Sequence, residues 1–207
     1  METEKTKEHR DRVLVYFAHP TPHKSRINSA MLQSLEGLED VTVRKLYDLY
    51  PDFHIDIKLE QRLLVEHNVI VWQHPFYWYS APPLLKEWID LVLEHGFAFG
   101  HEGNALKGKK VLTVTTTGGR QEAYREDGRN NFTMRQLLAP YEQTVNQCKM
   151  TYLPPFIVHG SLLIDEEHIR KAATDYRKII VSLRDKIFSN NELKEHMYMN
   201  NLLDQAV

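Results

Sequence analysis

The sequence predicts an α/β fold in which a five-stranded parallel sheet lies between two layers of helices. Five short β-rich runs alternate with segments of helical periodicity. Three of the runs are almost continuously apolar, as expected for strands buried on both faces of a parallel sheet. The length of 207 residues is common for one α/β domain. We therefore expect a single domain over residues 1–207, with a charged extension at 1–11 and a tail at 190–207.

The strands are predicted where β-branched, aromatic and aliphatic residues gather in short runs. In chain order the runs are VLVYFA (13–18), VTVRKL (41–46), VIVW (69–72), KVLTVTTT (110–117) and PFIVHG (155–160). Short strands of this number favour the flavodoxin-like order 2-1-3-4-5 over the six-stranded dinucleotide-binding order. The prediction is a flavodoxin-like three-layer sandwich.

Three helices are predicted where apolar residues recur three or four positions apart. The first follows Ser25, a good N-cap, and its stripe is Ile27, Met31, Leu35 and Leu38. The second is expected to end at Gly96, and its stripe is Leu84, Leu85, Trp88, Ile89 and Val92. The third begins after Asp165, and its stripe is Ile169, Ala173, Tyr176, Ile180, Leu183 and Ile187.

Other segments have a less regular helical pattern. Residues 58–65 predict a short helix, and the stripe Met134, Leu138, Tyr141 and Val145 predicts another that Pro140 should kink or interrupt. The tail carries Leu193, Met197, Leu202 and Leu203. We expect a frayed end there rather than a helix that binds a partner.

Composition and absent motifs exclude several classes of function. The net charge of −2, from 26 basic and 28 acidic residues, argues against a nucleic-acid partner. The single cysteine, Cys148, excludes an intrachain disulfide and predicts a small buried side chain. Without H-E-x-x-H or G-x-S-x-G patterns, we expect neither a metal centre nor an α/β-hydrolase. No apolar leader opens the chain and no apolar run approaches about 20 residues, so we expect a cytoplasmic protein.

In a sheet of this order, ligands bind beyond the carboxyl ends of the first and third strands, where the strand order reverses. Three loops should meet there. They are the first loop, HPTPHKSRIN (19–28), the second loop, HPFYWYSAP (74–82), and the third loop, TTTGGRQEAY (115–124).

The first loop leads into a helix whose N-terminal amides suit a phosphate group. Ser25 and Asn28 add polar side chains, and Arg26 adds a positive charge. The loop lacks the G-x-G-x-x-G and P-loop patterns, so neither an NAD Rossmann site nor a nucleotide hydrolase is indicated. Taken alone, it is equally compatible with a plain capped turn.

The second loop contains four consecutive aromatic residues, Phe76, Tyr77, Trp78 and Tyr79. Successive side chains in a turn point in different directions, so all four rings cannot enter the core. We expect at least one to pack on a neighbouring helix and the others to face the crevice. There they offer a flat apolar surface with polar atoms, as a planar heteroaromatic ligand requires.

The third loop joins the hydroxyls of Thr116 and Thr117 to Gly118 and Gly119. Glycine lets backbone amides approach a ligand closely. Together the three loops describe a phosphate grip, an aromatic wall and a hydrogen-bonding backbone edge. These are the parts of a flavin site.

Several motifs carry a family resemblance: FAHPTPHKSRIN, LYPDFHIDI, WQHPFYWYSAPPLLKEWID, HGFAFG, ALKGKK and TTTGG. In combination they resemble the flavodoxin-like NAD(P)H:quinone oxidoreductase family, especially the ancillary oxidoreductases of glutathione-regulated potassium-efflux systems. The resemblance covers residues 12–185. It implies bound FMN, with FAD as the alternative, NAD(P)H as electron donor, a quinone or related acceptor, and a homodimer.

The resemblance also implies a set of flavin contacts. The residues implied on the phosphate side are His19, Ser25, Arg26, Ile27 and Asn28. Those implied along the isoalloxazine are Pro75, Phe76, Tyr77, Trp78 and Tyr79. Those implied at its polar edge are Thr116, Thr117, Gly118 and Gly119. In the related diaphorases a tyrosine matching Tyr124 helps to stabilise reduced flavin, which makes Tyr124 the candidate catalytic residue. The histidine that follows six positions later in those enzymes is Asn130 here.

Two other functions stay open at this point. The resemblance to ancillary proteins favours a redox-sensing subunit on the cytoplasmic face of a potassium-efflux transporter, peripheral to the inner membrane. A one-electron carrier of the flavodoxin type is disfavoured, because those carriers are usually strongly acidic and this chain is nearly neutral. The choices between FMN and FAD and between NADH and NADPH are left open by the sequence.

Overall fold

The computed structural model describes residues 10–189, 192–193 and 195–203; most of the charged extension and the remainder of the tail lie outside these residues. Within the described residues, six parallel strands form one sheet in the order β2-β1-β3-β4-β5, with β6 also paired to β4. The strands are β1 (Val13–Phe17), β2 (Val41–Lys45), β3 (Val69–Pro75), β4 (Lys110–Thr116), β5 (Thr151–Tyr152) and β6 (Phe156–Val158). The predicted flavodoxin-like strand order is confirmed.

The fifth predicted run, residues 155–160, corresponds to β6, and the short strand β5 that precedes it was not predicted. Thr151 pairs with Lys110 near the start of β4, and Phe156 pairs with Val114 further along the same strand. Pro154 and Pro155 lie between the two pairings. A proline has no N–H to donate to the ladder, so the pairing is interrupted there and resumes in β6.

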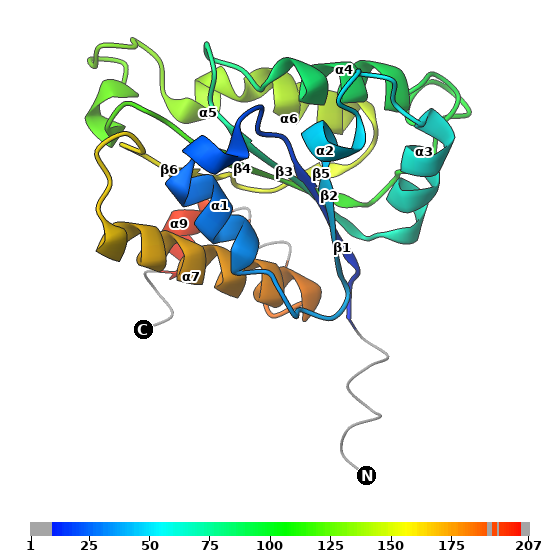
Figure 1. The fold of residues 1–207 in the computed structure, drawn as a ribbon. Coiled ribbons are helices and arrows are strands. Elements are labelled where there is room, and N and C mark those ends of the chain that lie inside the picture. Colours follow the sequence, from blue (N-terminus) through cyan, green and yellow to red (C-terminus); the bar gives the residue numbers. More distant parts are fainter. Residues whose placement is uncertain (1–9, 190–191, 194, 204–207) are drawn as a thin grey trace.

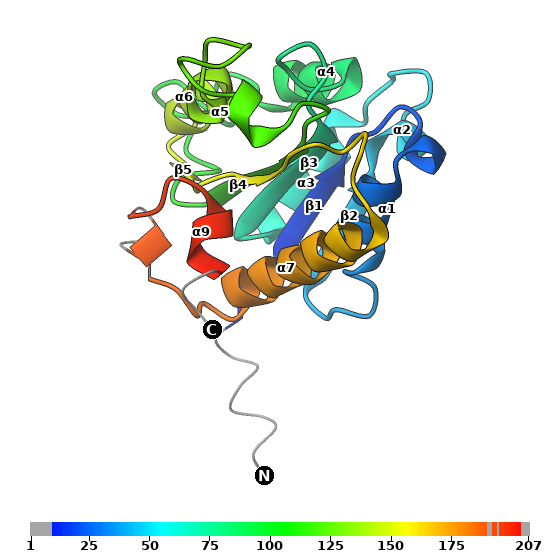
Figure 2. The ribbon, with the colours of Figure 1, turned by 90° about the vertical axis from the view of Figure 1, so that its left-hand side faces the viewer.

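Helices cover both faces of the sheet, as Figures 1 and 2 show. One face carries α1 (Arg26–Gln33), α7 (Glu166–Arg184) and α9 (Met199–Leu203). The other carries α2 (Leu46–Leu49), α3 (Ile57–Glu66), α4 (Pro83–Val92), α5 (Met134–Leu137) and α6 (Ala139–Gln147). Side chains of β1 alternate between the two layers: Val13 and Val15 pack on the α1 side, and Leu14 and Tyr16 on the α4 side. No helix in the described ranges is both long enough and apolar enough to cross a bilayer.

The expected helix starts are confirmed. The Ser25 hydroxyl accepts a hydrogen bond from the Asn28 amide at 3.3 Å and caps α1. The Asp165 carboxylate accepts from the His168 amide at 2.9 Å and caps α7. The helix predicted at 58–65 is α3. Pro140 marks the expected interruption, since α5 and α6 are separated at Leu138.

Three predicted helix ends are wrong. The helix α1 ends at Gln33, so Leu35 and Leu38 of its predicted stripe lie beyond it. The helix α4 ends at Val92 with Leu93 as its C-cap, so Gly96 lies beyond it. Gly96 has a φ of 81° and its amide donates to the Phe99 carbonyl in the next turn. The helix α7 ends at Arg184, and Ile187 is 60% exposed rather than part of the buried stripe. Cys148 is buried beside α6 as expected, and burial raises the pKa of its thiol to about 11.

The tail is not frayed between Met199 and Leu203, where it forms α9. Met199 and Leu202 are buried against β6 and α7. The Asn200 side chain accepts from the Ile157 amide at 3.1 Å and donates to the Ile157 carbonyl at 2.9 Å. The Asn200 carboxamide therefore forms the two hydrogen bonds that a neighbouring strand would otherwise form with the amide and carbonyl of Ile157 on β6.

We expect Asn200→Ala to lower the free energy of unfolding by about 1–3 kcal/mol, because both Ile157 backbone groups lose their partner. Urea unfolding measures the change. The matched control is Asn201→Ala, since Asn201 is exposed on the same helix. Equal losses in the two variants would contradict this role for Asn200.

Candidate functional site

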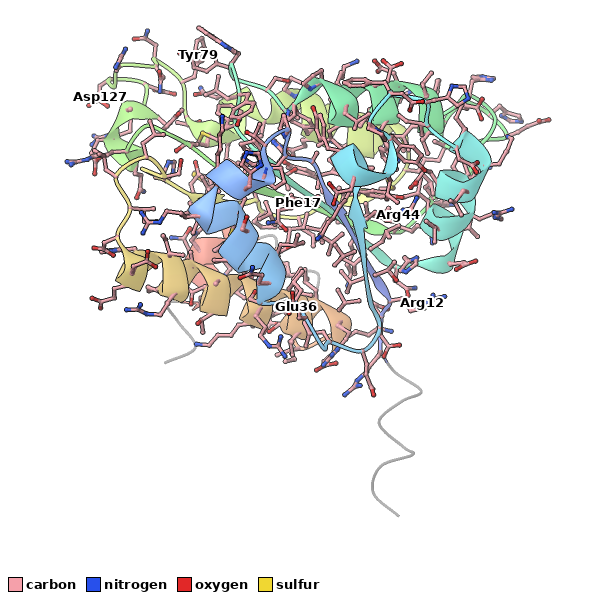
Figure 3. The ribbon with its side chains drawn as sticks, in the orientation of Figure 1. Arg12, Phe17, Glu36, Arg44, Tyr79 and Asp127 are labelled. Atoms are coloured by element: carbon pink, nitrogen blue, oxygen red, sulfur yellow. The ribbon has the colours of Figure 1, made fainter. Side chains whose placement is uncertain are left out.

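The three predicted loops meet at one end of the sheet. Figure 3 shows Tyr79 and Asp127 at this end and Arg12 at the other. The Phe76 amide donates to the Thr116 carbonyl at 2.8 Å, which joins the second loop to the third. The ring centroids of His19 and Tyr77 lie 6.0 Å apart, which joins the first loop to the second. The sequence-based expectation that these loops converge is confirmed.

His19 offers a hydrogen-bond donor from a buried position. It is 4% exposed, and its Nδ1 accepts from the Thr21 amide at 3.1 Å. Burial, with a further contribution from His23, lowers the pKa of His19. The neutral ring therefore carries its proton on Nε2, which is the donor that a phosphate or hydroxyl oxygen requires.

At the N-terminus of α1 the backbone amides are available as predicted, but the polar side chains predicted beside them are engaged within the protein. Ile27 is buried, so its contribution at the surface is its first-turn amide. Arg26 forms an ion pair with Glu166 at the start of α7, and its guanidinium donates to the Ile164 carbonyl at 3.4 Å. The charge of Arg26 is thus already partly balanced within the protein.

Asn28 lies beneath this helix terminus and links the first and third loops. It is 1% exposed, and its amide group donates to the Ser25 hydroxyl at 3.0 Å and to the Thr116 hydroxyl at 2.9 Å. The backbone carbonyl of Asn28 accepts from the side-chain amide of Gln73 at 3.1 Å, and the sequence interpretation did not single out Gln73. Asn28 supports the site from below and does not present its side chain at the surface.

The aromatic residues of the second loop form a tight turn. Tyr77 and Ser80 exchange both backbone hydrogen bonds, at 3.0 and 2.9 Å. Trp78 and Tyr79 have φ values of 48° and 63°, as in a type I′ turn. For any residue other than glycine, a positive φ raises the free energy of the folded state by about 1–2 kcal/mol per residue. We call residues 76–79 the aromatic turn.

The aromatic turn keeps most of its rings out of the core. Tyr77, Trp78 and Tyr79 are 42%, 93% and 52% exposed. Phe76 instead packs against the apolar core on the α4 side, as expected for at least one ring. Because the three exposed rings border the convergence of the loops, they are available as a wall for a planar ligand.

The third loop makes a turn, residues 118–119, that we call the glycine turn. The hydroxyls of Thr116 and Thr117 are buried and already hydrogen-bonded, that of Thr117 to the Gly119 carbonyl at 2.8 Å. A Cβ on Gly119 would lie 3.2 Å from the Tyr124 ring, and one on Gly118 would lie 3.2 Å from Leu162. The glycines therefore allow Tyr124 and Leu162 to lie directly over the turn.

Tyr124 follows the 3-10 turn η3 (Gln121–Ala123). Its ring contacts Phe76 at 6.3 Å and His159 at 5.5 Å between centroids. Asn130 accepts from the Tyr79 hydroxyl at 3.2 Å and so ties the loop after Tyr124 to the aromatic turn. The sequence interpretation missed His159 as a site residue, although its position near the carboxyl end of the last predicted run was a usable signal.

No group of three or more His, Cys, Asp or Glu is placed to hold a metal ion among the residues that the structure describes. The arrangement instead combines buried neutral donors, free helix amides and exposed rings.

The family described as a flavodoxin-like fold matches residues 11–180. The chain belongs to this family. It is 42% identical over 179 residues to the glutathione-regulated potassium-efflux system ancillary protein KefF of Salmonella arizonae, a match that covers 84% of this chain and 97% of that protein. The predicted resemblance to this family, and to its potassium-efflux ancillary members, is confirmed.

Solved structures show the same similarity. General stress protein 14 of Treponema denticola, in complex with FMN, is 35% identical with a TM-score of 0.79 and covers 83% of this chain and 99% of its own. An NADPH-quinone reductase from P. pentosaceus is 32% identical with a TM-score of 0.74, and the match covers 81% of this chain and 96% of the reductase chain. A chain described as a thermophilic tryptophan halogenase from Streptomycin violaceusniger is 40% identical with a TM-score of 0.79. That match covers 81% of this chain and 98% of the other chain.

We expect Trp78→Gly to raise the free energy of unfolding by about 1 kcal/mol, because glycine adopts a positive φ without the Cβ penalty. The same change should weaken FMN binding at least about tenfold if the exposed ring is part of the ligand wall. Urea unfolding and fluorescence titration measure the two effects. Trp78→Ala is the matched control, since it removes the ring and keeps the strain; an equal gain in stability from both variants would contradict the role of backbone strain.

Stability should fall as the pH drops below about 6.5, because several histidines resist protonation in the folded chain. His74 is fully buried, donates from Nδ1 to the Pro75 carbonyl, and has a pKa lowered by burial to about 4. The unfolded chain binds this proton near pH 6.5 and the folded chain near pH 4, so His74 contributes stability above pH 6.5 that is lost toward pH 4.

The loss from His74 is at most about 3 kcal/mol. Urea unfolding of the wild type and His74→Gln at pH 7 and pH 5 measures it, and the variant should lose less stability. Identical pH dependence would show that His74 is not responsible.

Proposed function

We propose that this protein binds FMN at the convergence of the three loops and catalyses electron transfer from NAD(P)H to a quinone or similar electrophile. The observation that carries the proposal is the aromatic turn, which holds three exposed rings beside a helix N-terminus and the glycine turn. The names of two similar proteins support it, since one is in complex with FMN and another is an NADPH-quinone reductase. FAD is the alternative flavin.

The residues fit a planar ligand with a phosphate tail. His19 presents an Nε2 donor, and the first-turn amides of α1 supply partial positive charge beside it. Arg26 neutralises Glu166, so the carboxylate does not repel a phosphate. The exposed rings supply flat apolar surface, and one of them, Tyr77, lies beside His19.

Flavin held here would supply two-electron chemistry that carries a hydride equivalent from NAD(P)H to the acceptor. The protein's part is orientation and electrostatics. Amides of the glycine turn would stabilise negative charge at the polar edge of the ring system. The Tyr124 hydroxyl lies above Gly119 and would donate a hydrogen bond there. The rings of the aromatic turn would limit the access of water.

Donor and acceptor would use the same face of the flavin in turn, so we propose ping-pong kinetics. We also propose a homodimer, because Trp78 and its exposed neighbours leave apolar surface at the site that a second copy would cover. The cytoplasm is the proposed location, where NAD(P)H is available.

A second candidate function is a redox-sensing ancillary subunit on the cytoplasmic face of a potassium-efflux transporter, peripheral to the inner membrane. The observation that favours it is the 42% identity to a protein named as the ancillary protein of such a system. The two functions are compatible on one chain.

The proposed activity is tested on the purified protein. We expect a flavin absorption spectrum, release of FMN on denaturation, and oxidation of NADH or NADPH that depends on benzoquinone. Initial rates should give parallel double-reciprocal lines, as ping-pong kinetics requires. A colourless protein that binds neither FMN nor FAD would contradict the proposal, and so would halogenation of tryptophan without quinone turnover.

The ancillary function requires a different readout. Affinity-tagged protein should recover a potassium-efflux transporter from solubilised membranes, and deletion of the gene should slow potassium efflux. Trp78→Gly should impair quinone turnover and leave recovery of the transporter unchanged. Loss of both together would show that one surface serves both functions.

A further inference from the structure

His159 stands at the end of β6 and reaches into the third loop. Its Nδ1 lies 3.0 Å from the Thr117 hydroxyl oxygen. The Thr117 hydroxyl donates its single proton to the Gly119 carbonyl at 2.8 Å. His159 Nδ1 must therefore be the donor in its contact with Thr117, and Nε2 is left without a proton in the neutral ring. The contacts define a chain of donors from His159 through Thr117 to Gly119.

This chain holds the carbonyl at the end of the glycine turn. The Gly160 amide also donates to the Gly119 carbonyl, at 2.9 Å, so this oxygen has two donors. The peptide that contains it is planar and trans, so its N–H, on Arg120, points the opposite way, away from β6. The orientation of the Gly119 carbonyl thus determines the direction of the next amide along the loop.

His159 also supports the candidate catalytic tyrosine. The rings of Tyr124 and His159 lie 5.5 Å apart at an angle of 35°, and Tyr124 extends over Gly119. Burial lowers the pKa of His159 to about 4, so the ring is neutral near pH 7 and its hydrogen-bonding pattern is constant there.

We propose that His159 is the positioning residue of the flavin's polar edge. Its Nδ1–H orients the Thr117 hydroxyl, which orients the Gly119 carbonyl and with it the Arg120 amide of the same peptide, and this amide would face the flavin. This inference rests on the proposed function, because it requires flavin at the glycine turn. It assigns a role to a residue outside the three loops that carry the expected flavin contacts.

Substitution of His159 by asparagine or glutamine can distinguish the role of Nδ1 from the role of Nε2. In His159→Asn the amide nitrogen occupies the place of Nδ1, so the donor to Thr117 is kept. In His159→Gln it reaches the place of Nε2, and in His159→Phe only the ring contact with Tyr124 remains. Thr117→Val removes the next member of the chain. Thermal melting of the flavin-free proteins establishes that each variant folds.

The readouts are the dissociation constant of FMN and the midpoint potential of the bound flavin. We expect His159→Gln, His159→Phe and Thr117→Val each to weaken FMN binding about tenfold, as the loss of one hydrogen bond predicts. Because amides at the polar edge favour the reduced form, the midpoint potential should fall by about 30 mV, equivalent to a tenfold change for two electrons. His159→Asn should stay within about twofold of wild type in both measurements.

The double variant His159→Gln with Thr117→Val should show no further loss, because both changes break one chain. Additive losses would overturn the inference. So would variants that match the wild type, or a result in which Gln preserves binding and Asn does not, which would indicate a role for Nε2. Wild-type protein that binds no flavin would instead refute the proposed function itself.

Discussion

The pairing of β3 with β4 is the constraint on which the site depends. Its register places Pro75 opposite Thr116, and β1 is aligned with β3 so that Phe17 lies opposite Gln73. The strands β3 and β4 therefore end together, two residues beyond the end of β1, and the loops that follow the three strands meet. Asn28 and Gln73 reinforce this arrangement beneath the surface, where their amides join α1 to β4 and β3. A shift of one residue in this register would turn the side chains of the shifted strand to the opposite face of the sheet.

The site combines a rigid support with a strained edge. Buried hydrogen bonds of Asn28, Thr116 and Thr117 hold the base of the loops. The aromatic turn above them contains two residues with positive φ that are neither glycine nor asparagine. Such conformations persist where surrounding structure enforces them, and they concentrate at functional sites. Here the exchange of hydrogen bonds between Tyr77 and Ser80 maintains the turn, and its effect is to keep Trp78 exposed.

The last third of the chain completes the fold in a way that bears on the site. The strand β6 leads directly into His159, and Asn200 of α9 satisfies the backbone of Ile157 on the same strand. The segment that supports the glycine turn is thus held on one side by β4 and on the other by α9. The residues of α9 lie beyond the 11–180 range of the family match.

The sequence by itself determined the alternation of strands and helices, the strand order, the capped starts of α1 and α7, and which three loops converge. These features follow from local periodicity, from the propensities of single residues and from the general topology of parallel sheets, and all of them are readable along the chain. Tertiary structure alone decided which side chains of the loops face outward. Asn28 is a surface candidate by sequence and a buried link in the structure, because its neighbours Ser25 and Thr116 offer it partners.

Long-range contacts decided the remainder. Asn130 replaces the histidine expected after Tyr124, yet His159 reaches the same tyrosine from β6, 35 positions further along the chain. The tail forms α9 because β6 presents Ile157 to Asn200. These residue pairs cannot be predicted from a short stretch of sequence, because each contact depends on how two segments far apart in the chain pack together. The elements were therefore predictable from local sequence, and the contacts that shape the site depend on the packing of the whole domain.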